Sequence, residues 1–511
     1  MFTAITQIRR LLRIARTFAR HDALFPLEQM GVAPVIVTLA RMLSRRDVPG
    51  RPGERLAAAL EELGPSFIKL GQALSVRSDL VGDDIAEDLS ALQDQLPPFA
   101  GERARAIIEE ELQMPLDAVF ESFDDTPVAA ASIAQVHFAR TVEGDDVAVK
   151  VLRPGIEDRF NRDIELFLWI ARMVERTQPS LRRLRPLAVV HTFQATVVTE
   201  MDLRLEAAAA SELRENTEGD PGFRVPKIDW VRTAQRVMTL ERIDGIQIDE
   251  IDALNEAGFA PRDVLQRSAE SFFNQVFRDG FFHADIHPGN MFVDREGTLC
   301  PVDFGIMGRL DARTRNYLAD MLLGFLDRDY KRVAEVHFEA GYVPARMSIG
   351  NFTQAVRSIG EPILGKPLHE ISLARLLAHL FQVTKTFEME AQPQLLLLQK
   401  TMLVAEGVGR TLDPSVNMWT LARPLVEEWV MAHRGPDARI RDAVTDAVSN
   451  LERLPRLVGR AEAVVEAMSA GSEPGPHIPR YGGDPSRQRW GPNWLVLILL
   501  GIIAFLLMRN F

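Results

Sequence analysis

Helical spacing of apolar residues covers most of this chain, and strand-like patterns are confined to its middle. Residues 261–280 and nearly all of 311–432 repeat apolar positions every three or four residues. Residues 25–60 show the same pattern with breaks near the Pro-Gly pairs at 49–50 and 52–53, and residues 102–123 are predicted to be one helix and a short connector. Short β patterns open at residues 128–137 and continue at 147–151, where apolar residues alternate or form brief runs. The patterning therefore predicts an α+β protein with a small sheet and a large helical part.

A second β pattern lies further along the chain, between polar segments at 283–290 and 301–305. Residues 291–293 and 298–300 are apolar and strand-like, and the sequence Asp-Arg-Glu-Gly at 294–297 separates them. This order predicts a β-hairpin. A hairpin returns its two outer ends to the same place, so the flanking polar residues should meet.

Three oxygen-bearing side chains would converge at that hairpin, namely Asp285, Asn290 and Asp303. Such a set suits Mg²⁺ carrying a nucleotide phosphate. The order H-x-D-x-x-x-x-N, hairpin, D-F-G is that of kinase-like phosphotransferases. A lone D-F-G arises easily by chance and His-Pro-Gly-Asn is an ordinary turn, but the combination favours the kinase-like interpretation.

Lys150 stands inside the apolar strand Val-Ala-Val-Lys-Val, where an unpaired charge is costly. It is either an edge-strand lysine facing solvent or the phosphate-contacting lysine of a kinase small lobe. Such a lysine needs a glutamate on a helix, and Glu206, four residues after Asp202, is a candidate. A solvated helix position is the alternative for Glu206. Glu241 lies where a kinase fold places the hinge between its lobes, which makes it a candidate nucleotide contact.

Lys69 and Gln72 fall on one face of a predicted helix, three residues apart. By composition alone this is a polar stripe on a helix surface.

The first twenty residues contain five arginines and no acidic residue. Apolar residues recur between the arginines at helical spacing, namely Ile5, Ile8, Leu12, Ala15 and Phe18. Such a basic amphipathic helix could lie on an anionic membrane surface. It also has the composition of a transit peptide, although serine is scarce. A solvated helix packed on its own domain is the third interpretation.

The C-terminus carries an uncharged run from Trp490 to Met508 that is long enough to cross a bilayer as a helix. Tryptophans and arginines at its ends suit the two interfaces. A Pro- and Gly-rich stretch at 471–493 precedes it and is predicted to be a linker. The sequence therefore predicts a membrane anchor, against the alternative of a buried soluble helix.

Composition narrows the remaining possibilities. The chain has 511 residues, 46% of them hydrophobic and 25% charged, which predicts a folded protein of two or three domains. A net charge of −12 argues against wholesale nucleic-acid binding. The single cysteine, Cys300, excludes an intramolecular disulfide and a Cys-based zinc site, and its apolar setting predicts a core residue.

With these residues in hand, the chain resembles the UbiB family of atypical kinases, also called aarF-domain kinases, over roughly residues 60–410. Lys69-x-Gly71-Gln72 is similar to the family's KxGQ motif, and Glu200-x-Asp202 to its ExD motif. The run Ala129, Ala130, Ala131, Ser132 resembles its alanine-rich loop, which replaces the glycine-rich loop of ordinary protein kinases. A hydrophobic C-terminal anchor is also typical of bacterial members.

The resemblance implies a two-lobed protein-kinase-like fold, ATP and Mg²⁺ as cofactors, and an N-terminal extension over the active site. The roles that it implies for residues of this chain are as follows: the alanine-rich loop and Lys150 hold the nucleotide, Glu206 pairs with Lys150, Asp285 is the catalytic-loop aspartate, and Asn290 and Asp303 hold metal. It places Lys69 and Gln72 near Glu200 and Asp202, in the space of a protein substrate. Lys69 is thus a candidate for both catalysis and regulation.

These interpretations divide the chain into six segments. They are a basic helical segment at 1–60, a KxGQ-containing extension at 61–123, a small lobe at 124–245, a large helical lobe at 246–432, a helix and linker at 433–489, and the anchor at 490–511.

The expected function is a membrane-anchored ATP-dependent kinase or ATPase that supports ubiquinone biosynthesis. The alternatives are a small-molecule kinase of the aminoglycoside- or choline-kinase type and a non-catalytic nucleotide-binding scaffold. Expected partners are a membrane lipid or polyprenyl-quinone precursor, with other quinone-biosynthesis enzymes as candidates and no nucleic acid. The expected location is the cytoplasmic membrane of a bacterium, with a single-pass anchor and the kinase-like part in the cytoplasm.

Overall fold

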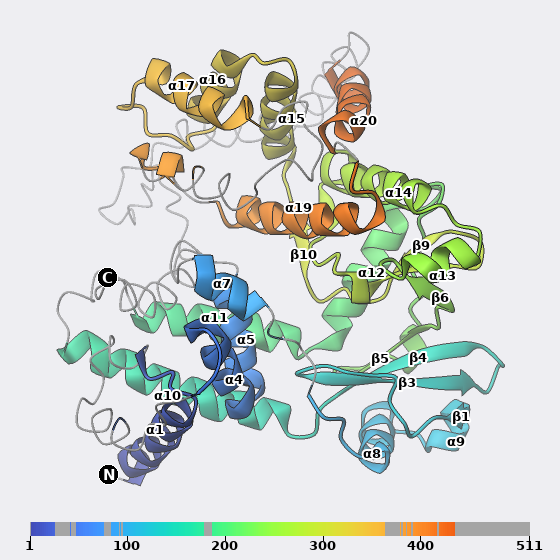
Figure 1. Ribbon diagram of the computed structural model, residues 1–511. Coiled ribbons are helices and arrows are strands. Elements are labelled where there is room, and N and C mark those ends of the chain that lie inside the picture. The colour runs from blue at the N-terminus through green and yellow to red at the C-terminus, as the bar shows by residue number, and fades with distance from the viewer. Residues whose placement is uncertain are drawn as a thin grey trace, which may run out of the picture.

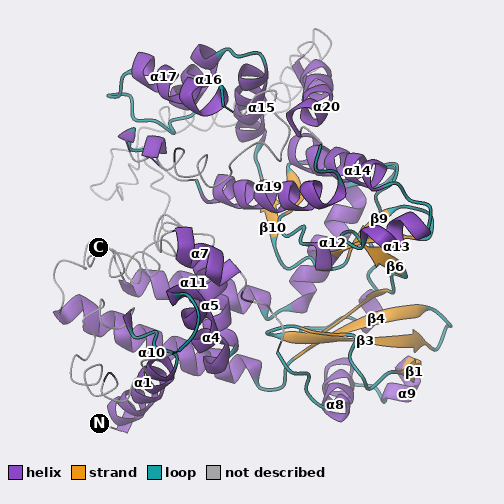
Figure 2. Ribbon diagram, viewed as in Figure 1, coloured by secondary structure: helices purple, strands orange, loops and turns teal. Residues whose placement is uncertain are grey.

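The computed structural model describes residues 2–25, 41, 48–75, 83–90, 92, 96–177, 186–362, 379, 382–384, 386–389, 392–415 and 418–434. Three bodies are visible in it (Figure 1): a small sheet, a mostly helical lobe beside it, and a second group of helices built from the N-terminus and from the middle of the chain. Strands are confined to the right-hand part of the view in Figure 2. The α+β, kinase-like architecture expected from the sequence is thus observed.

The sheet has the order β1-β3-β4-β5, and β2 pairs with β3. Its strands are β1 (Phe120–Phe123), β2 (Ala129–Ala130), β3 (Ala134–Thr141), β4 (Asp146–Leu152) and β5 (Val237–Glu241). All described pairings within it are antiparallel. The predicted strand at 147–151 is confirmed as β4. Because β3 and β5 flank it on both sides, the edge-strand interpretation of Lys150 is wrong.

Helix α8 (Gly101–Leu112) and the short α9 (Leu116–Val119) cover one face of this sheet (Figure 1). Val149 and Val151 of β4 pack in the same apolar cluster as Ile107 and Ile108 of α8. Ala148 and Leu152, on the other face, belong to the main core of the molecule. Burial on both faces explains why β4 is almost uniformly apolar rather than alternating.

Two long helices, α10 (Ile156–Thr177) and α11 (Pro186–Glu200), separate β4 from α12 (Leu203–Asn216). They leave the sheet and pack with four N-terminal helices, α1 (Phe2–Arg20), α4 (Pro52–Leu63), α5 (Pro65–Ser75) and α7 (Asp83–Ser90) (Figure 1). The ring of Phe167 on α10 contacts Phe67 on α5, with centroids 5.4 Å apart, and Phe193 on α11 at 6.1 Å. The segment predicted as a small lobe, 124–245, therefore contains two helices that pack with the N-terminal extension.

The basic helix α1 packs on its own domain, the third of the interpretations offered above. Ile14, Ala15 and Phe18 are buried in the main core, and α1 contacts α4 and α10. Leu12, expected on the apolar face, is instead 43% exposed. Ala15 and Phe18 of the predicted apolar face are buried as expected, so the prediction was wrong at Leu12.

The large lobe carries two small sheets, β6-β8-β9 and β7-β10. The strands are β6 (Gly245–Gln247), β7 (Phe281–His283), β8 (Met291–Asp294), β9 (Leu299–Pro301) and β10 (Met307–Arg309). The predicted hairpin is confirmed, since β8 and β9 pair antiparallel with Met291 opposite Pro301. Cys300 is fully buried in β9, as expected of a core residue.

The remaining helices form the rest of this lobe (Figure 1). They are α13 (Ile251–Glu256), α14 (Pro261–Phe273), α15 (Ala312–Leu326), α16 (Tyr330–Glu339), α17 (Ile349–Gly360), α19 (Pro393–Leu412) and α20 (Met418–Arg434). The helix predicted at 261–280 is α14, continued by a π-helical turn over Asn274–Asp279. Gly280 ends it with a φ of 66° and directs the chain into β7.

The predicted anchor at 490–511 and the linker before it lie outside the described residues. Within the described part of the chain, no helix combines the length and apolar character needed to cross a bilayer.

Candidate active site

The hairpin brings the polar residues at its two ends together. The amide of Val302, directly after β9, donates to the carbonyl oxygen of Asn290 at 3.0 Å. The side-chain amide of Asn290 donates in turn to the carbonyl oxygen of Asp285 at 3.3 Å. Since Nδ2 of Asn290 is the donor in this bond, Oδ1 is the atom left to act as a ligand.

His283, on β7, links the loop of Asp285 to the segment of Asp303. Its Nδ1 accepts from the backbone amide of Asp285 at 3.2 Å, and its Nε2 contacts the carbonyl oxygen of Asp303. These partners assign the neutral tautomer that carries hydrogen on Nε2. Burial lowers the pKa of His283, which favours this neutral form. The buried His283 ring thus links the backbone at Asp285 to the backbone at Asp303.

Lys150 meets both Glu206 and Asp303. Its Nζ donates to Oε1 of Glu206 at 2.5 Å and lies 3.4 Å from Oδ2 of Asp303. Glu206 also accepts from the backbone amide of Phe304 at 3.4 Å, while the Phe304 ring is buried in the main core. The lysine strand, the glutamate helix α12 and the D-F-G segment are therefore connected at one point.

The opposite charges of Lys150 and Asp303 stabilise each other. Burial opposes ionisation of Asp303, but chiefly the Lys150 ammonium and the Gly305 amide outweigh it and lower the pKa of Asp303 to about 2. Burial likewise opposes the charge on Lys150, yet the carboxylates of Asp303 and Glu206 raise its pKa. Asp303 is thus an anion and Lys150 a cation across the physiological pH range.

Lys69 lies on α5, and its Nζ is 3.3 Å from Oε2 of Glu200, the last residue of α11. Both side chains are mostly shielded from solvent. Asp202 caps α12 by accepting from the amide of Arg204, and its carboxylate also pairs with the Arg204 guanidinium. Lys69 and Glu200 of the two motifs are therefore adjacent. Gln72 follows Lys69 on the same helix and is partly buried.

Gly71, between Lys69 and Gln72, is required by packing. A Cβ atom there would lie 2.3 Å from Cδ1 of Leu92 and 2.9 Å from Cδ1 of Leu60. Only glycine lets α5 approach α4 and Leu92 this closely.

The alanine-rich loop forms the turn from β2 to β3. Ala129 and Ala130 pair with Val136 and Gln135, and the amide of Ala131 donates to the carbonyl of Ala134 at 2.8 Å. No residue of this turn has a positive φ, so its backbone does not need glycine. The Ser132 side chain is fully buried, and its Oγ has no hydrogen-bond partner in the described part of the chain.

Glu241 is bound to other residues of the protein. Its Oε1 accepts from Arg224 at 2.5 Å, and Arg224 also reaches Asp294 at the end of β8. The side chain therefore ties β5 to the hairpin, and its backbone remains at the position of the predicted hinge.

These residues fit a magnesium nucleotide. Asp303 supplies an ionised carboxylate and Asn290 an amide oxygen, which is the hard-oxygen chemistry that Mg²⁺ prefers. Among the described residues, no group of three or more His, Cys, Asp or Glu side chains is arranged to hold a metal alone. Phosphate oxygens would then supply the remaining ligands, as in kinases.

Two polar contacts escaped the sequence analysis, one beside Asp285 and one among the N-terminal helices and α10. Thr401 of α19 is fully buried and donates to the carbonyl of Ala284, next to Asp285, at 3.1 Å. Ser66 of α5 donates to the buried carboxylate of Asp163 on α10 at 2.7 Å, and Arg10 of α1 binds the same carboxylate. A threonine in an apolar helix and a serine after a proline carry no local signal for such distant partners.

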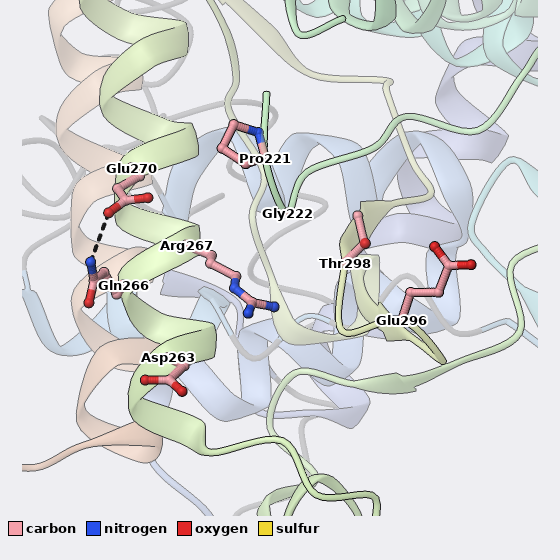
Figure 3. Close-up of a pocket in the computed structure, with 8 residues that line it drawn as sticks. All are labelled: Pro221, Gly222, Asp263, Gln266, Arg267, Glu270, Glu296 and Thr298. Atoms are coloured by element: carbon pink, nitrogen blue, oxygen red, sulfur yellow. Dashed lines mark hydrogen bonds between the residues drawn. The ribbon is translucent and has the colours of Figure 1, made fainter. Parts of the chain in front are cut away.

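A cavity of about 420 Å³ lies elsewhere on the large lobe, between α14 and the β8–β9 turn (Figure 3). Asp263, Arg267 and Glu270 line it from α14, with Glu296 and Thr298 opposite. None of the predicted site residues lines this cavity, so it is separate from the group around Lys150 and Asp303.

Comparison with known proteins identifies the family to which this chain belongs. Residues 91–337 match the ABC1 atypical kinase-like domain, and residues 356–417 match the UbiB helical domain. The chain is 41% identical to the probable protein kinase UbiB of Marinobacter nauticus, over 97% of this chain and 93% of that protein. The chain belongs to the UbiB family of atypical kinases. The probable protein kinase UbiB of Pseudomonas entomophila is also 41% identical, over 96% of this chain and 92% of its own length.

One solved structure supports the fold of this UbiB family member. It is the complex of Rv3197 with erythromycin from Mycobacterium tuberculosis, which is 25% identical to this chain with a TM-score of 0.51. The match covers 72% of this chain and 93% of the other. Family membership agrees with the resemblance drawn from KxGQ, the alanine-rich loop and ExD.

Proposed function

We propose that this protein is an ATP-dependent phosphotransferase or ATPase that uses Mg²⁺. The observation that carries the proposal is the meeting of Lys150, Glu206 and Asp303 at one point. A kinase uses this arrangement to hold a nucleotide phosphate and its metal. A scaffold that only bound nucleotide would not need the aspartate of the catalytic loop, Asp285, beside Asn290.

The residues divide the chemical work in the following way. When bound, the metal ion would neutralise charge on the phosphates that are transferred or hydrolysed. Asp303 and Asn290 would hold it, and Lys150 would contact the phosphates. Asp285 would orient the attacking hydroxyl or water and receive its proton. The alanine-rich turn would contact the nucleotide from the small lobe.

The proposed biological role is support of ubiquinone or polyprenyl-quinone biosynthesis at the cytoplasmic membrane of a bacterium. Family membership supports this role, since the chain is similar over nearly its whole length to proteins named UbiB. The uncharged segment 490–508 would anchor the protein, with the nucleotide site in the cytoplasm, where ATP is found. A membrane lipid or quinone precursor is then the proposed partner, and other quinone-biosynthesis enzymes are further candidates.

A small-molecule kinase is the second candidate. The solved structure of Rv3197 contains erythromycin, a small molecule, and that protein covers 72% of this chain. Against it, the Lys69–Glu200 pair is part of a motif set typical of the UbiB family rather than of antibiotic kinases.

Thermal unfolding with and without nucleotide tests the proposal. Mg²⁺·ATP or Mg²⁺·ADP at about 100 times Kd should stabilise the wild-type protein by about 2.7 kcal/mol. Asp303→Asn should abolish this stabilisation, whereas Asp244→Asn, which alters an exposed carboxylate paired with Arg295, should keep it. Equal stabilisation of wild type and Asp303→Asn would overturn the metal assignment. Nucleotide turnover with and without quinone-precursor lipid, or with a macrolide, then separates the two candidate functions.

A further inference from the structure

Arg153, directly after β4, binds two segments of the chain with one guanidinium group. Its Nε and one terminal nitrogen donate to the carbonyl oxygen of Ala131, at 3.0 and 2.8 Å. The terminal nitrogens also donate to the carbonyl oxygens of Pro97 at 2.9 Å and Leu96 at 3.2 Å. Ala131 belongs to the alanine-rich loop, and residues 96–99 form a connector within the predicted extension, directly before α8.

Every acceptor of this guanidinium is a backbone carbonyl. In the described part of the chain its side-chain hydrogen bonds all go to these carbonyls. Burial together with the charge of Arg159 lowers the pKa of Arg153. An arginine remains protonated even so. A planar fork of donors can satisfy three carbonyls at once, which a lysine ammonium on a flexible stem cannot reproduce.

A second contact holds the same connector from the sheet. The side-chain amide of Gln135, on β3, exchanges two hydrogen bonds with the backbone of Phe99, at 3.0 and 3.2 Å. The Phe99 ring lies 5.9 Å from the Arg153 guanidinium carbon. The backbone amide of Arg153 also donates to the carbonyl of Ile133 at 2.8 Å. The connector and the turn are therefore fixed to each other from two sides.

The direction of the Ala131 carbonyl determines where the next amide points. In a trans peptide the C=O and the following N–H point in opposite directions. Arg153 thus fixes the orientation of the Ser132 N–H. Within the described chain the amides of Ser132 and Ile133 have no acceptor, and neither has the Ser132 hydroxyl. Successive free amides in a turn form an anion-binding site.

We propose that Arg153 is a positioning residue: it holds the alanine-rich loop in its observed conformation, and it couples that conformation to the N-terminal extension through residues 96–99. This inference rests on the nucleotide-binding function proposed above. Movement of residues 96–99 would release the alanine-rich loop. A conformational change in the extension would therefore alter nucleotide binding at that loop.

Hydrogen–deuterium exchange and steady-state kinetics on the full-length chain test the inference. Arg153→Lys and Arg153→Ala should each speed exchange about tenfold in peptides covering 96–104 and 129–136. The KM for ATP should rise about tenfold while kcat stays within about twofold. Low millimolar guanidinium should restore protection and KM in Arg153→Ala but not in Arg153→Lys, because the lysine side chain occupies the vacated space.

Arg159→Ala is the matched control. Arg159 also donates to a carbonyl of the extension, that of Leu63 at 2.9 Å, without touching the loop. It should leave exchange at 129–136 and the KM unchanged. Exchange in a peptide from α15 shows whether each variant is folded. If Arg153→Ala does not fold, the result for Arg153→Lys tests the inference.

Two results would overturn the inference. The first is an Arg153→Lys variant whose peptide 129–136 exchanges at the wild-type rate. The second is a variant in which exchange becomes faster in 129–136 but stays at the wild-type rate in 96–104. If the wild-type protein neither binds nor hydrolyses ATP, the proposed function fails, whereas the exchange measurement still tests the coupling of loop and connector.

Discussion

Lys69 of α5 and Glu200 of α11 form an ion pair across two segments that are more than a hundred residues apart in sequence. The positive charge of Lys69 also contributes to the lowered pKa of Asp303. Lys150 lowers this pKa more, and Lys69 adds a smaller contribution from the extension.

Lys69→Ala should change how the nucleotide is held while leaving the fold intact. Removing the charge leaves Glu200 without this partner and weakens the field that keeps Asp303 ionised. We expect the ATP-to-ADP affinity ratio or autophosphorylation to change by about fivefold or more. Titration calorimetry and radiolabel incorporation measure these quantities after circular dichroism has established folding.

Lys331→Ala, which removes an exposed lysine paired with Glu335 on α16, is the matched control. If Lys69→Ala keeps wild-type ATP affinity, ADP affinity and autophosphorylation, Lys69 is a structural or surface residue and its proposed regulatory role is refuted.

Gly71→Ala should destabilise the protein although alanine favours helices. The added methyl would collide with Leu92 and Leu60, and overpacking of this kind costs about 1–3 kcal/mol. Gly407→Ala on α19 has open space around the new methyl, so only the helix-propensity gain of up to about 1 kcal/mol applies. Thermal melts should shift in opposite directions for the two variants. A neutral Gly71→Ala would show that the contact between α5 and α4 is loose.

Stability should fall as the pH falls below about 6.5, in part through His137. His137 is fully buried; its Nδ1 donates to the carbonyl of Asp124, and its Nε2 accepts from the Gln135 amide. Burial lowers the pKa of His137, and the carbonyl of Asp124 opposes this shift. Below the unfolded pKa, the unfolded chain binds a proton that the folded chain does not. The stabilisation is therefore present above pH 6.5 and is lost on acidification.

Melting temperatures between about pH 7.5 and about pH 5.5 measure this effect. His137→Gln should flatten the profile, whereas His191→Gln, at an exposed position of α11, should follow the wild type. Parallel profiles for all three proteins would exclude His137 as a contributor.

Deleting residues 490–511 should move the protein from the membrane to the soluble fraction, because this removes the uncharged segment. Fractionation with quantitative immunoblotting checks the result. Continued membrane binding would assign attachment to another surface, and the exposed arginines Arg9, Arg13 and Arg16 of α1 would be the next to substitute.

The sequence predicted those parts of the site whose signals are local. The hairpin at 291–301 follows from strand and turn residues that are neighbours in the chain, and β4 from one apolar run. The helices α10 and α11 between the lysine strand and Glu206 were not predicted from the sequence. The role of α5 as their partner therefore appears only in the structure.

Single polar residues were the least predictable. Arg153 follows a strand and precedes Pro-Gly, which is typical of a solvated turn, and its carbonyl partners lie 22 and 56 residues away. Leu12 shows the same limit for apolar residues, since one residue of rotation decides whether it is buried. Asp202 was expected to face Lys69, whereas the structure has it capping α12 and paired with Arg204.

The path of the chain from Lys150 to Glu206 has a consequence for how this protein can be dissected. That path leaves the sheet through α10 and returns through α11. α10 packs on α1 and α5 of the N-terminal helices, and Glu200 at the end of α11 pairs with Lys69 of α5. A shortened chain that began near residue 100 would expose the apolar sides of both helices, including Phe167, which rests on Phe67. Lys150 and Glu206 would then be connected by two helices that lack their packing partners. The extension is thus part of the minimal folding unit, and the nucleotide site cannot be excised from it as an independent domain.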